Sequence, residues 1–179
     1  ESVIDEEVGY VLDIGVDFVG GRRIDSLRQV LDEKYDAVFV GTGAPHGKEL
    51  KLPGRDDDPA HVHIGIAWLE SVAFEHIKAI GEKVLIIGVG NTAMDCCRTS
   101  MRLGAKSVRV VARKPRQFFK ASAWELDDAE EENVEIIVNR SPKQFVSENG
   151  KLKGMLFDVM EYELDARGRI TAEKITGEE

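Results

Sequence analysis

A glycine-rich turn contains the residues of this sequence best suited to hold a ligand. Gly88, Gly90 and Ala93 form the pattern Gly-x-Gly-x-x-Ala between an apolar run and a helical pattern. In such a turn the first glycine allows a tight bend, the second lets the backbone approach a pyrophosphate, and the small third residue keeps the helix close to the strand. The N–H groups at the start of the helix bind the anion.

The residues predicted to bind a dinucleotide are Gly88, Val89, Gly90, Asn91 and Thr92, the last two also through their side chains. The alternative is a glycine-rich turn in a nucleotide-free α/β domain.

The residues after the next predicted strand indicate which dinucleotide this turn binds. NAD-specific sites place an acid about 20 residues further on, where it accepts a hydrogen bond from the ribose 2′-hydroxyl. This sequence has Arg113 and Lys114 there, with Arg116 nearby. Cations suit the 2′-phosphate of NADP. Because the chain has a net charge of −9, a basic cluster at this position favours NADPH. A solvated basic loop is the alternative.

Other residue types that can do chemistry give weaker signals. Glu125, on the next predicted helix, is interpreted either as a surface acid or as a contact to the ribose and nicotinamide side of the cofactor. His61 and His63 have no further ligands nearby in the sequence, so we expect no metal site. The adjacent Cys96 and Cys97 lack the spacing of a disulfide or a Cys-x-x-Cys motif, and we expect reduced packing residues of a cytoplasmic protein. No side chain is assigned a catalytic role.

The elements around the turn are those of an α/β fold. Residues 83–87 are apolar on both faces, as a buried parallel strand requires, and residues 107–112 and 134–138 predict two further parallel strands. Helices are expected over about 91–103 and 122–133. The tail predicts a β-meander rather than another βαβ unit. The predicted fold class is therefore α/β, a Rossmann-like parallel sheet with an antiparallel β-meander whose strands lie near 144–146, 151–164 and 169–170.

The sequence before this sheet is less regular. A polar, turn-rich stretch over 45–63 is the best candidate for a domain boundary or crossover, and residues 64–80 have helical spacing. The expected elements of the first part are a helix over 4–12, a strand over 16–19, a short helix over 26–31 and a strand over 35–40.

Composition argues against two classes of partner. No uninterrupted apolar run approaches the roughly 20 residues that a membrane span needs. The acidic balance of the chain is weak evidence for a nucleic-acid binder, so we expect neither a membrane nor a nucleic-acid partner. The chain begins at Glu1 and ends in a polar stretch, from which we expect a piece of a longer protein.

Four segments resemble one family of oxidoreductases. Residues 88–99 resemble the NADPH-binding turn of the glutamate synthase small (beta) subunit and its relatives. Residues 35–44, 52–56 and 103–108 are similar to further conserved segments of that family, and the resemblance covers roughly residues 3–170. The sequence departs from the family after the second strand, where Phe118 and Phe119 replace the usual pattern and have no assigned contact.

The resemblance implies a protein with two cofactors. In the family an NADPH domain is inserted into an FAD domain, NADPH passes hydride to the flavin, and in glutamate synthase the electrons then reach a partner subunit. It implies that Gly41, Thr42 and Gly43 lie near the flavin in the intact parent.

The same resemblance divides the chain. Residues 1–62 are expected to be an incomplete part of the FAD domain and residues 63–175 the NADPH-binding domain, because the family's first Gly-x-Gly-x-x-Gly is missing. The expectation is an NADPH-binding fragment of a flavin-dependent oxidoreductase, inactive by itself. The alternatives are a non-catalytic dinucleotide-binding module and a flavin-free NADP-dependent dehydrogenase.

Overall fold

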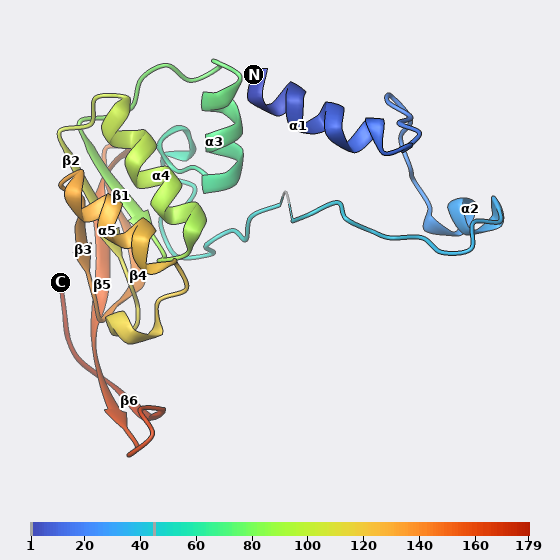
Figure 1. Cartoon of the computed structure of the whole chain (residues 1–179). Coiled ribbons are helices and arrows are strands. Elements are labelled where there is room, and N and C mark those ends of the chain that lie inside the picture. Colours follow the sequence, from blue (N-terminus) through green and yellow to red (C-terminus); the bar gives the residue numbers. More distant parts are fainter. Residues whose placement is uncertain (1, 45) are drawn as a thin grey trace. The chain divides into compact units, whose positions relative to one another are not determined.

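The computed structural model describes residues 2–44 and 46–179. The chain divides into two compact units, Glu1–Gly43 and Ala44–Glu179, and each unit is described by itself (Figure 1).

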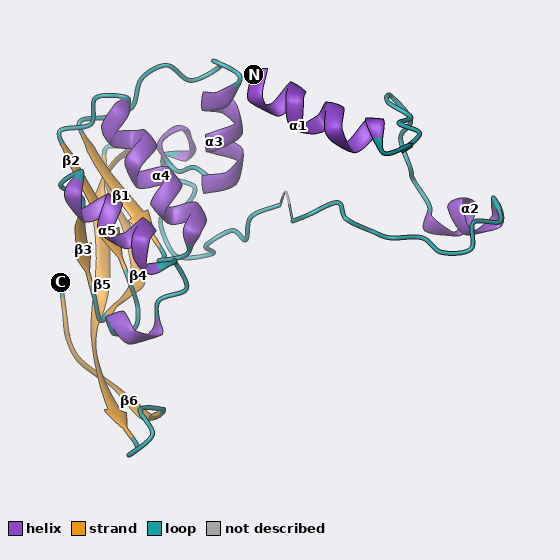
Figure 2. Cartoon of the chain, viewed as in Figure 1, coloured by secondary structure: helices purple, strands orange, loops and turns teal. Residues whose placement is uncertain are grey.

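Residues 2–43, the described part of the first unit, contain two helices and no sheet (Figure 2). Helices α1 (Ser2–Asp13) and α2 (Leu27–Asp32) confirm the two predicted there. The predicted strands over 16–19 and 35–40 are wrong, because both segments are irregular. A strand is stabilised by ladder hydrogen bonds to a neighbour, and no second strand is present in residues 2–43. None of these residues is buried, so the apolar side chains of this unit pack into no core of their own.

The second unit is built on a parallel sheet in the order β1-β2-β3. Strand β1 (Lys83–Ile87) pairs with β2 (Ser107–Val111), which pairs with β3 (Glu135–Ile137). The connections are helices α4 (Asn91–Arg102) and α5 (Ala123–Glu131), so each strand is joined to the next by a helical crossover. All five elements were predicted within a few residues of their observed ends.

A small apolar core joins the sheet to the helices. Val108 and Val110 of β2 pack with Met94 and Cys97 of α4 and with Ala129 of α5, and all five are buried. Figure 1 shows α4 and α5 beside this sheet. Burial of the two thiols raises the pKa of Cys96 to about 12 and that of Cys97 to about 11. Both cysteines are free thiols, as expected for packing residues.

Helix α3 (Gly65–Ala73) packs on α4 and is shorter than predicted. It ends at Ala73 with Phe74 as the C-cap, and the next residue, Glu75, has a left-handed backbone with φ of 59°. A Cβ at Gly65 would lie 3.0 Å from the Cys96 sulfur, so the glycine allows close helix packing.

The predicted β-meander is confirmed as a second, antiparallel sheet. Strands β4 (Arg140–Glu148) and β5 (Lys151–Leu164) are joined by Asn149 and Gly150, which both have positive φ. Two such residues are typical of a type I′ hairpin turn. Strand β6 (Ile170–Glu178) completes the sheet and is longer than predicted.

The turn-rich stretch before α3 is attached to this meander. The Phe145 amide donates to the Pro53 carbonyl at 2.9 Å, and the Leu152 amide donates to an Asp58 carboxylate oxygen at 2.9 Å. Asp58 also contacts the His61 Nδ1 at 2.8 Å, beside a short 3-10 turn, η1 (Pro59–His61). The contact with His61 and the hydrogen bond from the Leu152 amide both lower the pKa of Asp58, and the contact with His61 has the larger effect. The turn-rich stretch is therefore part of the second unit.

The helices of the described residues do not include one with the length and apolarity needed to cross a membrane.

Gly54 tests how tightly the turn-rich stretch is fixed to strand β4. It has φ of +77°, and a Cβ there would lie 2.4 Å from the Phe145 carbonyl oxygen. Because Gly54→Ala adds a clash with backbone to a left-handed conformation, we expect a loss of about 3 kcal/mol in the free energy of unfolding. Urea denaturation measures this loss.

Gly150→Ala is the matched control, because Gly150 has φ of +72° and no atom within 4 Å of its added Cβ. The strained backbone conformation alone is expected to lower the free energy of unfolding of this variant by only about 1 kcal/mol. Equal losses in the two variants would contradict the close packing at Gly54.

Candidate dinucleotide-binding site

The glycine turn lies between β1 and α4, at the carboxyl end of the parallel sheet. Gly88 has φ of +114°, a conformation that side chains rarely adopt. Its amide donates to the Val111 carbonyl at 2.9 Å, which ties the turn to the end of β2. This first glycine is therefore required by the backbone itself, as the motif predicts.

Gly90 is explained by space rather than by conformation. Its φ of −103° and ψ of 174° are extended values open to any residue. A Cβ at this position would meet no protein atom within 4 Å. The fold does not need a glycine here, and the open space lies at the N-terminus of α4. Because Gly90 is the N-cap and has no side chain, it leaves the first N–H groups of the helix without a side-chain cap.

The turn is held from the segment that leads into α5. The amides of Lys120 and Ala121 both donate to the Val89 carbonyl, at 3.2 and 3.1 Å. The Ser122 amide donates to the Asn91 side-chain oxygen at 3.3 Å. The Asn91 side-chain amide oxygen therefore links the starts of α4 and α5, a structural contact that the sequence did not reveal. Thr92 is exposed in the first turn of α4.

Glu125 lies in the first turn of α5 and is only 8% exposed. The interpretation of this residue as a surface acid is therefore wrong. Its carboxylate accepts a hydrogen bond at 2.6 Å from the hydroxyl of Ser122, which lies three residues earlier. An acid in the first turn of a helix also interacts favourably with the helix dipole. Ser122 thus connects Glu125 to Asn91 and so to the glycine turn.

Arg113 lies two residues after the end of β2 and receives two contacts from the meander. The Tyr162 hydroxyl donates to the Arg113 carbonyl at 2.6 Å. The Glu173 carboxylate lies 3.7 Å from the guanidinium, and both side chains are about half exposed. Neither contact was predicted, because Tyr162 and Glu173 are far from Arg113 in the sequence.

The other two cations of the loop have different surroundings. The Lys114 ammonium lies 5.8 Å from the centre of the Phe118 ring, a cation–π distance. Arg116 begins a 3-10 turn, η2 (Arg116–Phe118), and forms a two-point ion pair with Glu130 of α5. This pair raises the pKa of Arg116 and lowers that of Glu130.

These contacts also account for the two phenylalanines that distinguish this loop. Phe118 lies beneath Lys114, whereas Phe119 packs against the apolar core.

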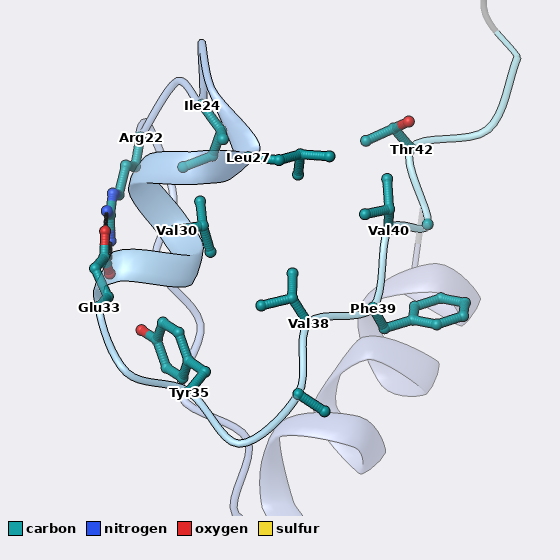
Figure 3. Close-up of a pocket in the computed structure, with 12 residues that line it drawn as sticks. Arg22, Ile24, Leu27, Val30, Glu33, Tyr35, Val38, Phe39, Val40 and Thr42 are labelled. Carbon is teal, nitrogen blue, oxygen red and sulfur yellow. Dashed lines mark hydrogen bonds and ion pairs between the residues drawn. The ribbon is translucent and has the colours of Figure 1, made fainter.

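The residues predicted to lie near a flavin belong to the first unit. Gly41 and Thr42 line a cavity of about 390 Å³ between α2 and the segment that follows it, and Gly43 comes next with φ of +67°. Leu27 and Val30 of α2 face this segment (Figure 3), while Phe39 points away. In residues 2–43 no glycine turn joins a strand to a helix, so the flavin contact of Gly41, Thr42 and Gly43 stays a prediction.

In the part of the chain that the structure describes, no group of three or more His, Cys, Asp or Glu side chains is arranged to hold a metal ion.

Comparison with known proteins identifies relatives of this architecture. The beta subunit of an NADPH-Fe(3+) oxidoreductase from Geobacter sulfurreducens is 32% identical over 182 residues, which cover 99% of this chain and 27% of that protein. The glutamate synthase [NADPH] small chain of Halomonas elongata is 31% identical, over 100% of this chain and 40% of that protein. These matches confirm the resemblance to the glutamate synthase small subunit. The chain spans less than half the length of either relative.

Solved structures share the fold at lower identity. FprA of Mycobacterium tuberculosis in complex with NADPH has a TM-score of 0.61 and 19% identity, covering 84% of this chain and 49% of FprA. Thioredoxin reductase of Lactococcus lactis has a TM-score of 0.51 and 19% identity, covering 73% of this chain and 39% of that one. The predicted α/β fold class is confirmed.

The family model described as pyridine nucleotide-disulphide oxidoreductase matches residues 6–172. Taken with the glycine turn and the α/β fold, this match shows that the chain belongs to the pyridine nucleotide-disulphide oxidoreductase family.

Proposed function

We propose that this chain is the NADPH-binding part of a flavin-dependent oxidoreductase of the glutamate synthase small-subunit type. The observation that carries the proposal is the open space at Gly90, beside the uncapped start of α4. A glycine that the fold does not need is explained by a ligand that must approach the backbone closely.

The two ends of the proposed site lie at one edge of the sheet. Ile87 and Val111 are register partners in the parallel strands β1 and β2, so the segments that follow them emerge side by side. The first of these segments offers the N–H groups of Asn91 and Thr92 to a pyrophosphate. The second offers Arg113 and Lys114 to a 2′-phosphate. Two separate anion sites are expected for NADPH, which carries both a pyrophosphate and a 2′-phosphate.

The chain's own contribution to the reaction is positioning. Residues of the glycine turn and the basic loop would hold NADPH, which when bound would supply hydride for a flavin of the intact parent. That step needs no side chain as acid or base. The hydrogen-bonded series Asn91, Ser122 and Glu125 fixes the starts of both helices at the site, and the buried Glu125 is the candidate contact to the ribose on the nicotinamide side.

We also propose that residues 63–175 form the NADPH domain and residues 1–62 belong to an FAD domain, of which the turn-rich stretch before α3 is the part that is hydrogen-bonded to the meander. The absence of a core within residues 2–43 supports this division. The exposure of strand β1 also supports this division. This strand lies at the edge of its sheet, and its apolar residues Leu85 and Ile87 are 39% and 36% exposed. Parallel sheets are normally covered on both faces. The relatives are named as small chains or beta subunits, which supports a separate electron-accepting subunit.

Gly90 provides the direct test of the pyrophosphate site. We expect Gly90→Val to weaken NADPH binding by roughly 100-fold or more, since it blocks at least two charge-assisted hydrogen bonds. The fold is expected to survive, because the extended backbone and open space accommodate a side chain. Fluorescence titration measures binding, and circular dichroism measures folding.

Gly154→Val is the matched control for this experiment. Gly154 lies in β5 and also has no atom within 4 Å of an added Cβ, but it is outside the proposed site. Unchanged NADPH binding by a folded Gly90→Val protein would show that the turn does not hold the pyrophosphate.

Cofactor preference tests the basic end of the site. We expect NADPH to bind more tightly than NADH, and Lys114→Gln to weaken NADPH binding about tenfold with little effect on NADH, because one charge-assisted contact is lost. Lys106→Gln removes the same charge at the other end of β2, where Lys106 pairs with Glu82, and is expected to change neither affinity. Equal affinities of the wild-type chain for NADPH and NADH at fixed salt would refute the role of Arg113 and Lys114.

A further inference from the structure

Two residues of the meander face each other and both contact Arg113. Tyr162 of β5 and Glu173 of β6 are register partners in the antiparallel ladder, so their side chains lie on the same face of the hairpin. The Tyr162 hydroxyl bonds the Arg113 carbonyl, and the Glu173 carboxylate faces its guanidinium. One cross-strand pair thus contacts both the backbone and the charge of a single residue of the basic loop.

The three cations of this loop differ in how available they are to an anion. Arg116 is held at two points by Glu130. Lys114 contacts the Phe118 ring and forms no ion pair with any residue that the structure describes. Arg113 lies between these cases, because its Glu173 contact is a single one at 3.7 Å, beyond hydrogen-bond distance. Because the ion pair is weak and half-exposed, an anion that binds more strongly readily displaces the Glu173 carboxylate from Arg113.

A 2′-phosphate is such an anion. It carries close to two negative charges and can accept two parallel hydrogen bonds from a guanidinium. To reach Arg113 it must displace Glu173 and tolerate the nearby carboxylate. Glu173 therefore opposes binding of a 2′-phosphate and is indifferent to a 2′-hydroxyl, which has no charge.

We propose that the β5–β6 hairpin adjusts the preference for NADPH over NADH, with Glu173 competing with the 2′-phosphate for Arg113 and Tyr162 positioning Arg113. This inference rests on the proposed function. It adds an acid, from a distant part of the sequence, that limits the NADPH preference created by the basic loop. Burial raises the pKa of Tyr162 above its ordinary value of 10.0, so its hydroxyl stays protonated and remains a donor at neutral pH.

The test compares affinities for NADPH, NADH and 2′,5′-ADP, which carries the 2′-phosphate without nicotinamide. In Glu173→Gln we expect NADPH and 2′,5′-ADP to bind about two- to fivefold more tightly at low salt, which is the range of an exposed ion pair. NADH binding is expected to stay constant. The gain should shrink as salt screens the charges.

Glu163→Gln is the matched control, because Glu163 is on the same strand as Tyr162 but on the opposite face of the hairpin. We expect it to change none of the three affinities. Tyr162→Phe removes one hydrogen bond and is expected to lower the ratio of NADPH to NADH affinity about threefold. A purely structural role for Tyr162 would lower both affinities together and leave the ratio unchanged.

The outcomes separate this inference from the function on which it rests. If the wild-type chain prefers NADPH but Glu173→Gln leaves or lowers that preference, the competition is refuted and the proposed function stands. An equal gain in Glu163→Gln would also refute it, since only net charge would matter. If no version of the chain binds NADPH or 2′,5′-ADP, both the proposed function and this inference are overturned.

Discussion

The left-handed backbone at Gly88 is the constraint on which the candidate site depends. Its φ of +114° turns the chain from the end of β1 directly into α4, and its amide fixes that turn to the last carbonyl of β2. A residue with a side chain would strain this bend. Without this bend, the first N–H groups of α4 would not lie at the carboxyl end of the sheet, where an anion can reach them.

The rest of the second unit places a second charged segment beside that helix start. Parallel strands joined by helical crossovers end at the same edge, so Arg113 and Lys114 emerge next to the glycine turn. The core of Met94, Val108, Val110 and Ala129 holds both helices to the sheet. The antiparallel meander then contributes Tyr162 and Glu173 to the loop. Cofactor selectivity in this account is a property of both sheets together.

Local pattern was enough to predict the parallel sheet and its two connecting helices, because their signals are contained in short windows of sequence. The apolar run of β1, the glycines after it and the helical period of α4 agree with one another. The strand predicted over 35–40 failed because a strand exists only with a partner, and none is present in residues 2–43. The contacts of Glu173 and Tyr162 with Arg113 were missed for a related reason, since they depend on how two sheets meet. Glu125 was ambiguous because sequence does not show which side of a helix is covered.

In the proposed site the Gly88–Thr92 turn holds the pyrophosphate, and Arg113 and Lys114 hold the 2′-phosphate. Backbone amide resonances test it most directly, in ¹H–¹⁵N spectra of the labelled chain recorded during addition of NADPH. We expect the largest shifts at Gly90, Asn91 and Thr92, with a second group at Arg113 and Lys114 that NADH does not reproduce. Large NADPH-induced shifts elsewhere in the chain, with the amides of the turn unmoved, would contradict it.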